Sequence, residues 1–171
     1  MEMKSHMRQM CGWHVWAIER FFASVDRASD ADYRLDIGLF FKSIHGSVNH
    51  MLVVERLWRG RLNGVPAGLK SLDQELESDR AKLKELVLDS ARAWWPYVDA
   101  MSSEEFHGLL HYKNLAGQEM ALPRISLVHT MFTHGAHHRG QVTTALTQLG
   151  LETPELDYPY YLAALPREQL N

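Results

Sequence analysis

Residues 123–150 read PRISLVHTMFTHGAHHRGQVTTALTQLG, and this stretch decides which fold we predict. On a helical wheel of about 100° per residue, its apolar side chains gather in one stripe centred on Val128. Gly150 follows the stripe, and glycine is the residue that most often comes directly after a helix. The pattern therefore predicts a long amphipathic helix from Pro123 to Gly150, with a buried stripe made of Ile125, Val128, Met131, Phe132, Val142, Leu146 and Leu149.

Three earlier segments have the same three- and four-residue spacing of apolar side chains. The first covers residues 13–29, and the second covers residues 39–62 without an internal proline. The third covers residues 71–97, where Ser71 and Gln74 resemble a capping box. Four long helices joined by short connections predict an all-α fold, a four-helix bundle.

The connections between these helices carry turn residues. Residues 31–36 are expected to be a turn between the first two helices. Between the third and fourth helices, residues 106–112 and 119–122 flank the turn residues 114–117, which predicts a small hairpin. Residues 156–165 are aromatic and interrupted by proline, and we expect them to pack over the bundle as a short final turn.

Composition limits the class of protein. The 171 residues, 46% of them apolar and 23% charged, fit a single soluble globular domain that spans residues 1–171. A net charge of -3, without a cluster of Lys or Arg, argues against nucleic acid or an anionic membrane as a partner. Residues 1–10 are too polar for a signal peptide, and the apolar runs are too short to cross a membrane. We therefore expect a cytoplasmic protein in which the single cysteine, Cys11, is an unreactive core residue.

The chain has ten histidines, and several of them fall in the last helix. His138 and His134 lie about 80° and 120° from Val128, at the margin of the apolar stripe, whereas His137 points away from it. A spacing of four residues places two imidazoles about 6 Å apart along a helix, so that both can bind one metal ion. Ordinary hydrogen-bonded histidines at a helix margin have the same spacing. We predict that His134 and His138 are metal ligands and that His137 faces solvent.

A third ligand would have to come from another helix. The second helix contains His45 and His50, which lie on different faces, and their spacing does not choose between them. This helix is apolar on two faces, so we expect one face to contact a second copy in a homodimer. Arg139 lies within the apolar stripe of the last helix, where a cation requires a partner, and Glu55 is the predicted partner.

The string His134-Gly135-Ala136-His137-His138-Arg139-Gly140-Gln141 resembles the late-helix motif of the DinB/YfiT-like superfamily, in which two histidines four residues apart precede Arg-Gly-Gln. The resemblance extends over nearly the whole chain and is weakest between Ser71 and Leu122. One departure is His14, which stands where members of the superfamily often have asparagine. The other matching segments are Trp13-His14-Val15-Trp16-Ala17, Asn49-His50, Glu55-Arg56-Leu57-Trp58 and Pro154-Glu155-Leu156-Asp157.

The resemblance implies a bundle of up-down-down-up type that holds a divalent metal, often nickel or zinc. It also implies that the three ligands are His50, His134 and His138, which selects His50 over His45. Relatives include transferases and isomerases that depend on a small thiol such as mycothiol or bacillithiol.

Three functions fit these observations. The leading hypothesis is a metal-dependent transferase that acts on a small-molecule substrate with a low-molecular-weight thiol, because three neutral imidazoles leave a coordination position open. The second is a metal-dependent hydrolase, which needs a general base near a metal-bound water. The candidate bases for that reaction are His111, Asp157 and Glu19. The third is a non-catalytic bundle that binds metal or a partner.

Overall fold

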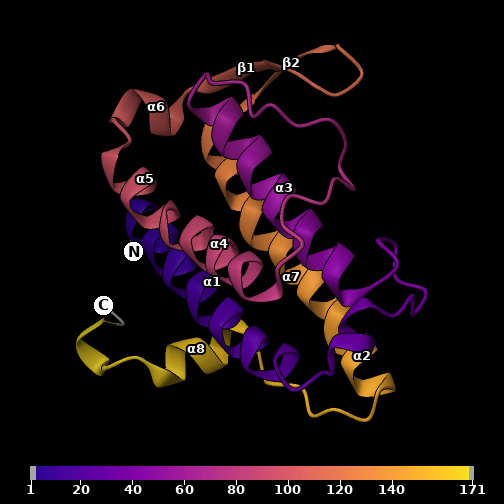
Figure 1. The fold of residues 1–171 in the computed structure, drawn as a ribbon. Helices are drawn as coiled ribbons and strands as arrows, with labels where there is room; N and C mark the ends of the chain where they lie inside the picture. The colour runs from indigo at the N-terminus through magenta and orange to yellow at the C-terminus, as the bar shows by residue number, and fades with distance from the viewer. Residues whose placement is uncertain (1–2, 170–171) are drawn as a thin grey trace.

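Four helices form the main body of the computed structural model, which describes residues 3–169 (Figure 1). They are α1 (Met3–Val25), α3 (Ile44–Leu62), α4 (Arg80–Arg92) and α7 (Arg124–Gln148). Helix α3 packs against α4 and α7, and α1 packs against the same two helices. The expectation of a mainly helical protein is therefore confirmed, and the contact between α3 and α7 decides where the site lies.

Shorter elements close the ends of this body. The expected hairpin is present, since β1 (Leu109–Lys113) and β2 (Glu119–Pro123) pair antiparallel with Leu110 opposite Leu122. It lies near one end of α3 and α7 (Figure 1). The remaining elements are α2 (Asp30–Arg34), α5 (Trp94–Ala100), α6 (Ser103–His107), α8 (Tyr158–Ala164) and a final 3-10 turn (Arg167–Gln169).

The last long helix has the predicted limits, whereas the first does not. Helix α7 spans Arg124–Gln148, and Gly150 follows it with a φ of 74°, a conformation that glycine adopts without strain. Helix α1 begins at Met3 instead of Trp13 and ends at Val25 instead of Ser29. The polar residues before Trp13 obscured a buried face that includes Met7. The segment expected to be a turn contains the short helix α2.

Helices α3 and α4 both begin later than predicted, because a polar side chain caps each of them. The hydroxyl of Ser43 accepts a hydrogen bond from the Gly46 amide at 3.0 Å, so α3 begins at Ile44 instead of Leu39. Asp79 caps α4, and the capping box predicted at Ser71 is wrong. Residues 66–79 instead run as an irregular segment beside α3, and this segment contributes to the site.

Both apolar faces of α3 are buried within this chain. Val48 and Leu52 belong to an apolar cluster with residues of α1, α4 and the C-terminal part of α7. Val54 belongs to a second apolar cluster with residues of α1, α5 and the N-terminal part of α7. The second apolar face therefore gives no argument for a subunit interface. The tail packs on the body as expected, since Trp13 donates a hydrogen bond to the Leu156 carbonyl at 2.8 Å.

Within residues 3–169, the structure has no helix with the length and apolar character that crossing a bilayer requires.

Candidate metal centre

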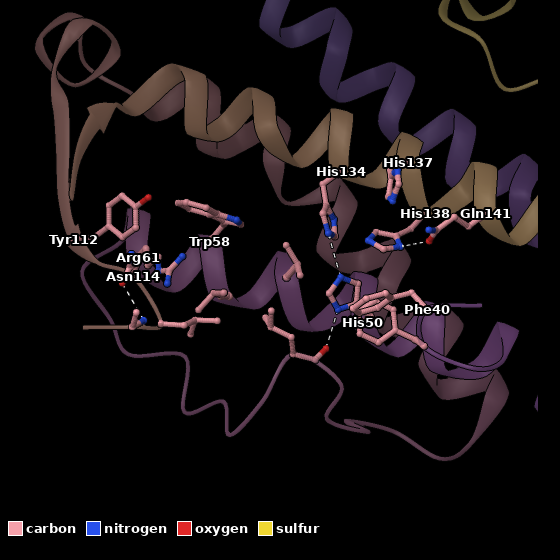
Figure 2. Close-up of a pocket in the computed structure, with 16 residues that line it drawn as sticks. Phe40, His50, Trp58, Arg61, Tyr112, Asn114, His134, His137, His138 and Gln141 are labelled. Atoms are coloured by element: carbon pink, nitrogen blue, oxygen red, sulfur yellow. Dashed lines mark hydrogen bonds between the residues drawn. The ribbon is translucent and has the colours of Figure 1, made fainter. Parts of the chain in front are cut away.

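Three histidines from α3 and α7 meet at the wall of a cavity (Figure 2). They are His50, His134 and His138, and each offers a ring nitrogen such that the three nitrogens lie within 4.8 Å of one another. The Nε2 atoms of His50 and His134 are 3.2 Å apart. The structure thus brings together the three residues that the resemblance implied.

Hydrogen bonds fix the orientation of two of these rings. Nδ1 of His50 donates to the carbonyl of Leu72 at 2.8 Å, and Nδ1 of His138 donates to the side-chain oxygen of Gln141 at 2.8 Å. A neutral imidazole that donates from Nδ1 carries its lone pair on Nε2. Both Nε2 lone pairs are therefore available to a metal ion, and the second ring nitrogens have the kind of partner that holds metal-ligating histidines in place.

Burial lowers the pKa of all three imidazole rings and so favours their neutral form. Phe41 stacks on His50 with a centroid distance of 3.7 Å and an interplanar angle of 17°, and it also contacts His138. Burial, together with a smaller effect of the neighbouring imidazoles, lowers the pKa of His134 to about 3 and that of His138 to about 4. Burial likewise lowers the pKa of His50. Unprotonated imidazoles that converge on one point fit the needs of a divalent first-row metal ion.

Two other histidines that the sequence singled out lie outside this group. His45 is buried on another face of α3, where its Nε2 is 2.7 Å from a carboxylate oxygen of Glu75. His137 is exposed, as predicted, although its ring lies on the cavity wall and its centroid is 4.8 Å from that of His138. The structure therefore groups His50, and not His45, with the pair on α7.

The cavity beside the histidines has a volume of about 690 Å³ and a mostly apolar wall. Figure 2 shows the histidines at one end and Trp58, Arg61 and Tyr112 at the other. The three bases considered for a hydrolase, Glu19, His111 and Asp157, do not line it. The lining residues are Phe40, Phe41, His50, Val54, Leu57, Trp58, Arg61, Leu72, Tyr112, Asn114, Leu115, Ala116, His134, His137, His138 and Gln141.

A buried polar chain lies behind the histidines, between α1, α3 and α7. Nε2 of His14 donates to Glu55 at 2.8 Å, and the Arg139 guanidinium approaches Nδ1 of His14 at 3.4 Å. Burial lowers the pKa of His14, so its ring is neutral and links the two charged groups. Glu55 is thus the carboxylate that offsets the charge of Arg139, as predicted, but within the described residues the two side chains form no direct ion pair and are connected through the ring of His14. Arg139 also lies over the Trp13 ring, 5.1 Å from its centroid.

Gly135, between the two histidines of α7, leaves room for this polar chain. A Cβ at this position would lie 2.8 Å from Cε1 of His14 and 2.9 Å from a guanidinium nitrogen of Arg139. We expect Gly135→Ala to lower the free energy of unfolding by about 1–3 kcal/mol, measured by urea denaturation. Gly140→Ala is the matched control on the same helix, because nothing lies within 4 Å of its Cβ position. Equal stability changes in the two variants would contradict this explanation.

The lowered pKa values of His134 and His138 predict that acid destabilises the metal-free protein. Histidine in an unfolded chain has a pKa of about 6.5. As the pH falls below this value, His134 and His138 bind protons in the unfolded state but remain unprotonated in the folded state. Stability is therefore full above about pH 6.5 and decreases as the pH falls toward about 4. We expect a loss of about 1–2 kcal/mol between about pH 7 and about pH 5, after allowance for solvent screening.

Urea denaturation at both pH values, with a chelator present, measures this effect. The double variant His134→Ala/His138→Ala should show a smaller pH dependence than the wild type. A double variant with the full pH dependence of the wild type would show that other groups cause it.

The chain is similar to known proteins over most of its length. Residues 3–169 match the family model described as "DinB family". Protein DinB of Bacillus subtilis (strain 168) is 24% identical over 156 residues, an alignment that covers 88% of this chain and 90% of that protein. Since the family model extends over almost the entire sequence, from α1 to the final turn, the chain belongs to the DinB family.

Proposed function

We propose that this protein is a metal-dependent transferase that joins a low-molecular-weight thiol to an electrophilic small molecule. In this proposal His50, His134 and His138 hold one divalent ion, nickel or zinc, and α1, α3, α4 and α7 form an up-down-down-up bundle around it. The observation that carries the proposal is the position of three neutral imidazoles on the wall of a cavity of about 690 Å³. A cavity of this size holds a small organic molecule.

The protein residues would position the reactants and keep water away from them. The ion, when bound, would supply Lewis acidity that favours the thiolate form of a thiol. Leu72 and Gln141 fix the rings of His50 and His138, so the donor nitrogens are oriented before any ligand arrives. Phe41 covers the ring of His50 and excludes water from that side.

The reacting thiol would come from a second substrate, because the chain's own thiol is unsuitable. Cys11 is 1% exposed, and burial raises its pKa to about 12, so it stays protonated near neutral pH. It belongs to the core cluster and does not line the cavity. Mycothiol and bacillithiol are the small thiols that we propose for this role.

A hydrolase is the second candidate, and one observation favours it. The exposed ring of His137 lies on the cavity wall next to His138 and is a suitable acceptor for the proton of a bound water. Among the described residues that line the cavity, none is a carboxylate, which is the usual base in hydrolases that use zinc. This lack makes the hydrolase the weaker candidate.

The experiment that separates the candidates is a turnover screen on metal-loaded protein. Mycothiol and bacillithiol are each tested with a fluorogenic electrophile such as monochlorobimane, and a panel of esters and amides is tested without thiol. We expect electrophile consumption that requires both metal and thiol and is lost in His138→Ala. Ester or amide hydrolysis without thiol would instead establish the hydrolase. No turnover in either screen would overturn both enzymatic proposals in favour of a non-catalytic metal-binding protein.

A further inference from the structure

The cavity has a second polar end, formed by Arg61 and two aromatic rings. The guanidinium carbon of Arg61 is 4.8 Å from the ring centroid of Trp58 and 4.8 Å from that of Tyr112. The rings of Trp58 and Tyr112 also contact each other edge to face, with centroids 5.4 Å apart. Figure 2 shows this group at the opposite end of the cavity from the histidines. The two rings restrict the guanidinium to a small region at the cavity wall.

One face of α3 connects the two ends. His50, Val54, Leu57, Trp58 and Arg61 all line the cavity, and their spacing of four, three, one and three residues is that of a single helix face. With a rise of 1.5 Å per residue, the backbone positions of the first and the last are separated by about 16 Å along the axis. The residues between them present an apolar surface. The cavity thus suits an elongated molecule with an apolar middle.

Arg61 is the only permanent charge at the cavity wall among the described residues that line it. No carboxylate lies within ion-pair distance of Arg61 in residues 3–169. One guanidinium nitrogen donates weakly to the Lys113 carbonyl at 3.4 Å, and a guanidinium has five N–H donors in all. Asn114 does not compete for a ligand, because its side chain is hydrogen-bonded within the hairpin turn. Arg61 therefore has donors left for an anion inside an otherwise apolar cavity.

We propose that Arg61, between Trp58 and Tyr112, binds the carboxylate of an elongated small molecule whose other end reaches the three histidines. The guanidinium fork matches a carboxylate through two parallel hydrogen bonds, and apolar surroundings strengthen such a pair. This inference rests on the proposed function, which it deepens by assigning the substrate class. That class is a small molecule with a thiol or electrophilic group at one end and an acidic group at the other.

The test compares two long-chain thiols that differ only at the far end. Mercaptoundecanoate carries a carboxylate there, and mercaptoundecanol carries a neutral hydroxyl. Both are titrated by calorimetry into metal-loaded wild type, Arg61→Gln and the control Arg56→Gln, which removes the same charge from an exposed position of α3. We expect Arg61→Gln to weaken mercaptoundecanoate binding roughly tenfold or more and to leave mercaptoundecanol within about threefold. Arg56→Gln should change neither affinity.

Two further arms keep the result interpretable. Arg61→Lys retains the positive charge but lacks the planar guanidinium, so it should bind mercaptoundecanoate with an intermediate affinity. This variant replaces Arg61→Gln in the comparison if Arg61→Gln does not fold. Undecanoate, which has no thiol, is titrated into the single variant His138→Ala and into the double variant His138→Ala/Arg61→Gln. This comparison measures the contribution of Arg61 to carboxylate affinity without the metal. An undecanoate affinity that depends on Arg61 supports the subsite even if the metal proposal fails. Equal affinities for the acid and the alcohol in wild type, or no effect of Arg61→Gln on the acid, would overturn it.

Discussion

His138→Ala is expected to lower the affinity of the protein for a divalent metal ion by about a hundredfold or more and to abolish metal-dependent thiol transfer. Catalytic zinc sites usually have three protein ligands, and two imidazoles hold the ion much less tightly. The remaining ligands, His50 and His134, come from different helices and would no longer enclose the ion. Titration of the metal against a competing chelator measures the loss, and the turnover screen measures the activity.

Two neighbouring variants are the controls for this prediction. His137→Ala removes an exposed imidazole from the next position and should retain full metal affinity. Gln141→Ala removes the acceptor that orients His138 and should lower the affinity less, by about tenfold, as changes to partners of metal ligands do. An unchanged affinity in His138→Ala, or a loss in His137→Ala as large as that predicted for His138→Ala, would show that the ligand set is wrong.

Glu55→Leu is expected to lower the free energy of unfolding by about 3–5 kcal/mol, the largest stability change we predict. Glu55 is 6% exposed and accepts hydrogen bonds from His14 and from the indole of Trp94. Its removal leaves the charge of Arg139, which is 1% exposed, without a compensating carboxylate. Burial lowers the pKa of Arg139 only to about 10, so this arginine remains charged at neutral pH. Urea denaturation of the metal-free protein measures the effect.

A double-mutant cycle assigns this loss to the buried polar chain. Arg139→Met in the Glu55→Leu background removes the orphaned charge and should recover part of the stability, giving a positive coupling between the two sites. Glu19→Gln is the surface control, because Glu19 pairs with Arg92 in solvent and should matter by less than about 1 kcal/mol. Additive losses at Glu55 and Arg139 would contradict a connection through His14.

The sequence predicts the histidine-bearing helix well, because that prediction depends on one periodic pattern. The ends of α7 follow from Pro123 and Gly150, and the exposure of His137 follows from the helical wheel. The spacing of His45 and His50 along α3 did not show which of them is the third ligand, and both are buried in the structure. Only the resemblance chose between them, and the pairing of His45 with Glu75 explains physically why His45 has another role.

The parts of the site that the sequence missed come from segments without a repeating pattern. Phe41 lies in the loop before α3. The predicted helix began at Leu39 and included Phe41, but the Ser43 cap makes α3 begin at Ile44. The Leu72 carbonyl that orients His50 belongs to a segment predicted to be helical, in which that carbonyl would have bonded to its own helix. Tyr112 reaches Arg61 from a strand fifty-one residues later in the chain. Gln141 alone carried a signal, because its spacing of three from His138 lets the two side chains meet on one helix.

The most direct test of the metal centre is a crystal structure of the protein loaded with one divalent metal, with diffraction data collected at the absorption edge of that metal. Our account predicts one anomalous peak per chain, about 2.0–2.1 Å from a ring nitrogen of each of His50, His134 and His138, with an open coordination position toward the cavity. Anomalous density at other residues such as His45 or His137, or no bound metal between α3 and α7, would contradict it.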